Sequence, residues 1–185
     1  QTTHTMTTIV ATKRGAIAKV SHGHLTITNN TQTTTAKCTL QTPTHIATNP
    51  SCTMIAVSDH TQIHLYQRPV DGVLKLSCQK VFVESRDADD AIVFMDFHPM
   101  SPVHLVVLTA KGVLGVLKAP HLTSFDDIVR VCSPQDYSLR CKSASFVSSR
   151  GSSTLNCFAL FVLLETGEVM LLNPITVSEG TVVVP

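Results

Sequence analysis

Tryptophan is absent from this 185-residue chain, and charged residues make up only 15% of it. The 14 Lys and Arg residues are scattered along the chain and are balanced by 13 Asp and Glu residues. This distribution argues against a broad nucleic-acid surface, because such surfaces need clustered cations. Hydrophobic residues nevertheless account for 43% of the chain, so the composition is that of a folded domain and not of a disordered segment.

No hydrophobic run is long enough to cross a membrane as a helix. The longest, "CFALFVLL" at residues 157–164, is followed by Glu165, whereas a membrane-spanning helix needs roughly 18 or more apolar residues. The first residues show no charged region followed by an apolar one, so no signal peptide is visible. We therefore expect no membrane span.

Recognised cysteine motifs are also missing. The six cysteines are irregularly spaced and form no CxxC pair, and the chain is long enough to fold around its own core without disulfides. Several alternate with apolar residues, as Cys78 and Cys157 do, where a free cysteine behaves as a small hydrophobic residue. These features predict free thiols and a cytosolic or nuclear setting.

Motifs that hold metals, phosphates or nucleotides are lacking too. "HGH" places His22 and His24 two residues apart, but no other Cys or His stands at the spacing of a zinc site, which favours a polar turn. "DADD" at residues 87–90 lacks the Gly and the distal Glu of an EF-hand loop, which favours an acidic loop. No Gly-rich phosphate-binding or dinucleotide-binding motif occurs, so we expect no metal, no cofactor and no small-molecule substrate.

The chain does contain a repeated pair of apolar strands. Each copy has a strand, a short polar turn and a second strand; the copies lie at residues 9–20, 55–66, 106–117 and 161–172. The same turn position holds a glycine in three copies and a threonine in the other: Gly15, Thr61, Gly112 and Gly167. Glycine suits a tight hairpin because such turns require a positive φ angle.

The turns recur about every 50 residues, close to the period of roughly 40–50 residues that is typical of a propeller blade. A further strand precedes each of the last three hairpins, at residues 43–48, 91–97 and 142–147. Another strand follows the second hairpin at residues 73–83, and "HLTITN" at residues 24–29 is a candidate outer strand of the first unit. Four antiparallel strands per period is the content of one propeller blade.

The predicted fold is therefore all-β: a β-propeller with WD40-like blades of four antiparallel strands. About three and a half to four blades are covered, in one partial propeller domain over residues 1–185 with units at roughly 1–42, 43–90, 91–141 and 142–185. Because propellers have typically 4–8 blades and an unclosed array exposes strand edges, we expect a larger ring. The alternative fold, a viral or secreted β-sandwich, predicts two stacked sheets.

The competing interpretation is a catalytic centre formed by Asp96, His98 and His104. The equivalent place in the preceding unit reads "TNP" at residues 48–50, and a position that recurs from unit to unit belongs to the scaffold. A serine protease of the chymotrypsin type would need a triad, for which the candidates are His45 or His60 with Asp96 and Ser152. No GxSxG nucleophile elbow is present, so we expect no enzyme, with this protease as an alternative.

Residues 119–134 form an insertion between the third and fourth units. Ser124 could cap a short helix over residues 125–131, with Asp126 and Asp127 near its positive end. The apolar side chains at near-helical spacing are Leu122, Phe125, Ile128 and Val129. Such a face either covers its own propeller or binds a partner protein, and in the second case Phe125 is the expected anchor.

Two segments resemble blades of a known family. The units ending in "HLYQ", "GVLK" and "MLLN" resemble divergent WD-type blades that lack the Gly-His and Trp-Asp signature pairs. Residues 97–117, and residues 160–175 after "SASFV", are similar to two consecutive blades of the cytoplasmic-face nucleoporin family that anchors the mRNA-export platform. Phe97 stands where that family has Trp, and Gly115 stands where it has Arg.

This resemblance implies a non-catalytic scaffold propeller of a nuclear pore subunit, involved in mRNA export and nucleocytoplasmic transport. The implied partners are proteins, namely other nucleoporins and mRNA-export factors, without direct nucleic-acid binding. The implied location is the cytoplasmic face of the nuclear pore, with the cytoplasm as the alternative. A propeller subunit of another trafficking or regulatory assembly is the alternative function.

Overall fold

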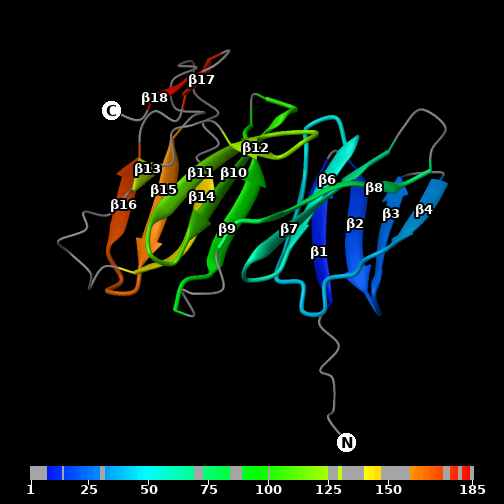
Figure 1. Cartoon of the computed structure of the whole chain (residues 1–185), viewed down its shortest axis with the longest axis horizontal. Helices are drawn as coiled ribbons and strands as arrows, with labels where there is room; N and C mark the ends of the chain where they lie inside the picture. Colours follow the sequence, from blue (N-terminus) through cyan, green and yellow to red (C-terminus); the bar gives the residue numbers. More distant parts are fainter. Residues whose placement is uncertain are drawn as a thin grey trace, which may run out of the picture.

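The computed structural model describes residues 8–13, 15–29, 32–68, 73–83, 89–99, 101–124, 129–130, 140–146, 159–172, 176–178 and 181–183. These residues form strands and turns and include no helix. Figure 1 shows the sheets following one another along the long axis of the molecule, in the order of the sequence. No helix in this described part is long and apolar enough to span a membrane.

The first two sheets each contain four antiparallel strands in sequence order. The first sheet comprises β1 (Ile9–Lys13), β2 (Ala16–Ser21), β3 (His24–Asn29) and β4 (Gln32–Lys37). The second sheet comprises β5 (His45–Thr48), β6 (Met54–Ser58), β7 (Gln62–Gln67) and β8 (Lys75–Val81).

The later sheets repeat this plan with changes at the outer edge. The third sheet comprises β9 (Ile92–Phe97), β10 (His104–Thr109), β11 (Val113–Lys118) and two short strands that both pair with β11, β12 (Thr123–Ser124) and β13 (Val129–Arg130). The fourth sheet comprises β14 (Cys141–Phe146), β15 (Leu160–Leu164) and β16 (Val169–Leu172). A separate hairpin pairs β17 (Thr176–Ser178) with β18 (Thr181–Val183).

The first strands of the four sheets lie side by side: β1 contacts β5, β5 contacts β9, and β9 contacts β14. Each sheet therefore presents one edge to a common centre and faces its neighbours, which is the blade arrangement of a propeller. The predicted partial β-propeller is confirmed, and the β-sandwich with two stacked sheets is wrong. A chymotrypsin-like fold is excluded for the same reason. The predicted unit boundaries at 42, 90 and 141 stay predictions.

The core is divided among the spaces between consecutive sheets. One apolar cluster joins the first and second sheets and includes Leu25, Ile55 and Tyr66. A second joins the second and third sheets, and a third joins the third and fourth. The central strands are buried on both faces, as in β10, where five of six residues are buried. This burial explains why they read as continuous apolar runs.

The hairpin at Gly15 joins the first and second strands of its sheet, and not the second and third strands as the repeat in the sequence indicated. Gly15, with φ of 78°, lies in the turn between β1 and β2, whereas Gly112 and Gly167 lie between the second and third strands of their sheets. Residues 24–29 form the third strand of the first sheet, and the outer strand is β4. The alignment was wrong because successive hairpins in an antiparallel sheet share one apolar pattern.

The helix predicted over residues 125–131 is wrong at its carboxyl end. Val129 and Arg130 form β13, which pairs with Leu114 and Val113 on the outer edge of β11. Because β11 would otherwise have an unpaired edge, main-chain pairing there competes with the weak helical pattern of the sequence. Residues 125–128 and 131 lie outside the described residues.

Candidate binding site between the first two sheets

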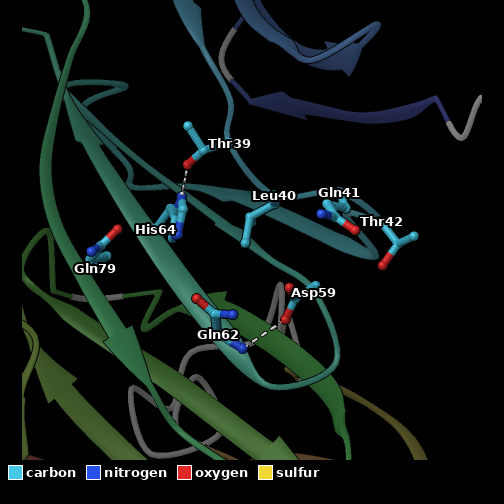
Figure 2. A pocket seen from close by; sticks show the side chains of 8 residues that line it. All are labelled: Thr39, Leu40, Gln41, Thr42, Asp59, Gln62, His64 and Gln79. Atoms are coloured by element: carbon cyan, nitrogen blue, oxygen red, sulfur yellow. Dashed lines mark hydrogen bonds between the residues drawn. The ribbon is translucent and has the colours of Figure 1, made fainter.

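A polar cavity of about 340 Å³ lies where the chain crosses from the first sheet to the second. Figure 2 shows the side chains that line it, which come from the β4–β5 connection, the β6–β7 turn, β7 and β8: Thr39, Leu40, Gln41, Thr42, Asp59, Gln62, His64 and Gln79. Leu40 is the one apolar residue among them. The cavity is therefore suited to polar groups.

His64 is the buried polar residue of this site, with 3% of its surface exposed. It lies on the face of β7 that also presents Tyr66 to the first sheet, since residues two apart on a strand share a face. Thr39 Oγ1 lies 3.4 Å from His64 Nδ1. Burial lowers the pKa of His64 below its ordinary value, and the Asp59 carboxylate opposes this shift in part. The imidazole is therefore neutral at neutral pH.

Asp59 has a structural role at the rim of the cavity. Its Oδ1 accepts hydrogen bonds from the main-chain N–H groups of Thr61 and Gln62, at 2.8 and 2.7 Å, and from Thr61 Oγ1 at 3.3 Å. These bonds hold the β6–β7 turn, in which Thr61 replaces the positive-φ glycine of the equivalent turns. An aspartate cap and a glycine are thus two solutions to the same hairpin.

Three carboxamide side chains, those of Gln41, Gln62 and Gln79, reach this cavity from three different segments. A carboxamide can donate and accept hydrogen bonds at once, so the set can bond both to groups that accept and to groups that donate. Thr39 is the hydroxyl beside His64, but within the described part of the chain no third residue orients the imidazole.

Two of the candidate triad residues, His45 and Asp96, lie on opposite sides of the third sheet. His45 Nδ1 lies 2.9 Å from Thr44 Oγ1 and 3.5 Å from Ser58 Oγ, between the second and third sheets. Asp96 pairs with Val106 on the face of the third sheet that packs on the fourth, and its Oδ1 accepts the main-chain N–H of Phe97. The carbonyl of His60 accepts the N–H of Ile92. Ser152 lies outside the described residues.

His98 belongs to the scaffold, as the repeat indicated. The N–H of Asn49 donates to Met54 O, and the N–H of Cys52 donates to Asn49 O. In the next sheet the N–H of His98 donates to His104 O, and the N–H of Ser101 donates to His98 O. Asn49 and His98 are both buried, so they are equivalent turn residues at the end of each innermost strand. His98 also packs edge-to-face on Phe146.

The predicted docking segment is only partly described. Leu122 is buried in the core between the second and third sheets, and its carbonyl accepts a 3.0 Å hydrogen bond from Lys80 Nζ. Phe125, Ile128 and the side chain of Val129 lie outside the described residues. Leu122 thus helps to anchor this connection to the propeller, and partner binding by the segment stays a prediction.

The structure also shows the positions of the His22–His24 motif and of four cysteines. His22 and Gly23 form the two-residue turn between β2 and β3, with φ angles of 53° and 71°, so the polar-turn interpretation is confirmed. Cys38, Cys52, Cys78 and Cys141 are free thiols. Within the described ranges no group of three or more Cys, His, Asp or Glu side chains is placed to hold a metal ion.

Sequence reasoning missed the cavity residues His64, Gln62 and Gln79. The available signal was the alternation in "QIHLYQ", where Gln62 and His64 are polar residues on a face that is otherwise apolar at Tyr66. Alternation alone predicts which face these residues share. Alternation does not reveal that the connection at residues 38–44 leaves a cavity beside Gln62 and His64 on this face of β7.

Comparisons with solved structures report the same fold. A chain of the Chaetomium thermophilum Nup82 NTD–Nup159 TAIL–Nup145N APD complex matches with a TM-score of 0.69 and 13% identity, over 91% of this chain and 42% of that chain. Sqt1 from Chaetomium thermophilum matches with a TM-score of 0.67 and 16% identity, over 94% and 47%. The Cps50 (Swd1) β-propeller domain of Myceliophteria thermophila matches with a TM-score of 0.66 and 10% identity, over 95% and 59%.

No family model matches the chain, and no curated protein matches it either. The chain spans about half the length of the structures that it matches. At these identities the likeness concerns the fold. The chain thus has the fold of a β-propeller segment, and this fold is similar to those of a chain of the Nup82 NTD–Nup159 TAIL–Nup145N APD complex and of the Cps50 (Swd1) β-propeller domain, among others.

Proposed function

We propose that this chain is part of a non-catalytic scaffold propeller in a nuclear pore subunit, and that it acts by protein–protein interaction in mRNA export and nucleocytoplasmic transport. The observation that supports this most is the structural likeness to the complex of Nup82 NTD, Nup159 TAIL and Nup145N APD over 91% of the chain. The same class was implied independently by the blade motifs at residues 97–117 and 160–175.

The physical basis is a rigid frame with polar openings between blades. Strands such as β10 and β11 are fixed by packing on both faces, so recognition is left to loops and inter-blade cavities. The cavity beside His64 offers hydrogen-bonding side chains that suit a peptide segment. Sqt1, a propeller of similar fold, is known in a complex with the N-terminus of the ribosomal protein L10, a partner that is a chain terminus.

The proposed partners are other nucleoporins and mRNA-export factors, and the proposed location is the cytoplasmic face of the nuclear pore. The experiment is to tag the natural protein that carries this sequence and to image it at the nuclear envelope. Co-purification with nucleoporins and a punctate nuclear rim are expected. Depletion should raise nuclear poly(A) RNA. A protein that is absent from the rim and captures no nucleoporin overturns the proposal.

A propeller subunit of another trafficking or regulatory assembly is the second candidate. It is favoured by the matches to Sqt1 and to Cps50 (Swd1), whose TM-scores of 0.67 and 0.66 are close to that of the nucleoporin complex. The same imaging and co-purification separate the two candidates, because this one predicts a different location and a different set of captured proteins.

A further inference from the structure

The outward face of the fourth sheet is apolar and exposed. On this face β15 and β16 place two cross-strand pairs, Phe161 with Leu171 and Leu163 with Val169. Phe161 is 42% exposed, Leu171 is 52% exposed and Val169 is 63% exposed. The opposite face of the same two strands packs on the third sheet through residues such as Leu160 and Val162.

The three preceding sheets have pairs at the same two positions, and there every pair is buried. The pairs lie between the second and third strands of each sheet: Ala18 with Ile27, Val20 with Leu25, Ala56 with Leu65, Ser58 with Ile63, Val106 with Val116, and Leu108 with Leu114. None of these twelve residues is more than 3% exposed. In each case the sheet that follows in the sequence covers the pairs.

We infer that Phe161, Leu163, Val169 and Leu171 form the docking surface for a further propeller blade, supplied by a longer polypeptide that contains this chain. The surface is the fourth member of a series whose first three members are blade-to-blade interfaces. The solved propellers that this chain matches are single chains of about twice the length, since the chain covers only 42–59% of them.

The covering blade has a predictable chemistry. In the three existing interfaces the following sheet contributes two apolar residues, two apart, from its second strand: Ile55 and Val57, Leu105 and Val107, Leu160 and Val162. The blade that covers Phe161 and Leu171 should do the same, with an aliphatic pair on its second strand. Burial of these side chains supplies the driving force, at about 25 cal/mol per Å² of apolar surface.

A second copy of this chain is a poorer occupant. The surface it could offer in the same orientation is the outward face of its first sheet, where Ile17 pairs with Thr28 and Lys19 pairs with Thr26. Thr26 and Thr35 lie 3.4 Å apart there through their hydroxyl oxygens. Packing Lys19 against the apolar pairs would remove an ammonium group from water, and burying an unpaired charge is costly.

The test uses cysteine labelling at two matched valines. Val169→Cys lies on the proposed interface, and Val81→Cys lies on the outermost strand of the second sheet; the two valines are 63% and 60% exposed. Each variant is made in the 185-residue chain and in the natural polypeptide that carries it. Labelling by iodoacetamide is followed for the corresponding peptide by mass spectrometry, which separates these sites from the native cysteines.

Both sites should react readily in the 185-residue chain. In the natural polypeptide, Val169→Cys should be protected by at least about a hundredfold, because labelling then requires opening of a packed interface, while Val81→Cys should react as before. Equal labelling of both sites in the natural polypeptide overturns the proposal. Protection of Val169→Cys in the 185-residue chain that disappears on dilution assigns the face to a second copy and overturns it as well.

Discussion

The ring of Phe82 lies directly against the backbone of Gly115. A methyl group on Gly115 would stand 2.7 Å from Phe82 Cζ and 2.8 Å from Phe82 Cε2, inside van der Waals contact. Phe82 follows β8 and packs on the core between the second and third sheets, while Gly115 lies in the middle of β11. The absence of a side chain at Gly115 therefore allows the end of one blade to pack on the third strand of the next.

Gly115→Ala should lower the free energy of unfolding by about 1–3 kcal/mol, because the added methyl group forces Phe82 to move within a packed region. Urea unfolding followed by circular dichroism measures the change. The double variant Gly115→Ala with Phe82→Ala provides the control, since a cavity at Phe82 removes the clash. If the two single losses simply add in the double variant, the contact between these residues does not explain the cost.

Asn49 connects the second and third sheets through its side chain. Its Nδ2 donates to Pro102 O at 3.0 Å, and its Oδ1 accepts the N–H groups of Thr53 and Met54 at 2.9 and 3.0 Å. Asn49→Ala removes all three hydrogen bonds, one of them to the buried N–H of Met54, and should cost about 1–3 kcal/mol of stability. Ser51→Ala in the same turn removes only an exposed hydroxyl contact and should change stability by less than about 0.5 kcal/mol. Similar losses in both variants would argue against the role of the Asn49 side chain.

Much of the fold could be predicted because its signals are local. The strand–turn–strand pattern around Gly112 and Gly167 and the break after Phe97 follow from alternation and turn chemistry. His98 could be assigned to the scaffold because Asn49 occupies the same place one unit earlier. These interpretations needed only neighbouring residues and one comparison between units.

The rest depends on contacts between distant segments. The order of the strands in the first unit was predicted wrongly because the hairpins at Gly15 and Gly23 have similar sequence patterns. Only the contact of β1 with β5 shows that β1 is the innermost strand. Val129 and Arg130 pair with β11 although the local pattern favours a helix. The cavity beside His64 exists because residues 39–42 pass across another sheet, and no local pattern records that path.

The propeller should become less stable as the pH falls through 6.5 and below. Burial is the first cause that lowers the pKa values of His45, His64 and His104 from their ordinary value of 6.5. In this pH window the unfolded chain binds protons that the folded chain does not, so the free energy of unfolding falls as pH falls. Once the pH lies well above 6.5, these three groups are neutral in both states and contribute no slope.

The measurement for this pH dependence is the unfolding midpoint in urea at pH 7.5, 6.5 and 5.5. His64→Gln should give a flatter dependence than the unaltered chain, because it removes one titrating group while keeping a hydrogen-bonding side chain. Gln62→Ala, at the same cavity, removes no titrating group and should leave the slope unchanged. A slope that His64→Gln does not alter would show that this histidine is not part of the effect.

The connection after β11 allows packing and partner binding to be separated with two variants. Leu122 is 1% exposed in the core between the second and third sheets, so Leu122→Ala should lower the free energy of unfolding by about 2–5 kcal/mol. If the segment binds a partner, Phe125→Ala should weaken capture of that partner severalfold and leave the melting temperature nearly unchanged, because an aromatic anchor acts mainly in the complex. Thermal unfolding and pull-down of the natural protein measure the two effects. A Phe125→Ala variant that loses stability and keeps its partners would show that the segment covers its own propeller, as Leu122 does.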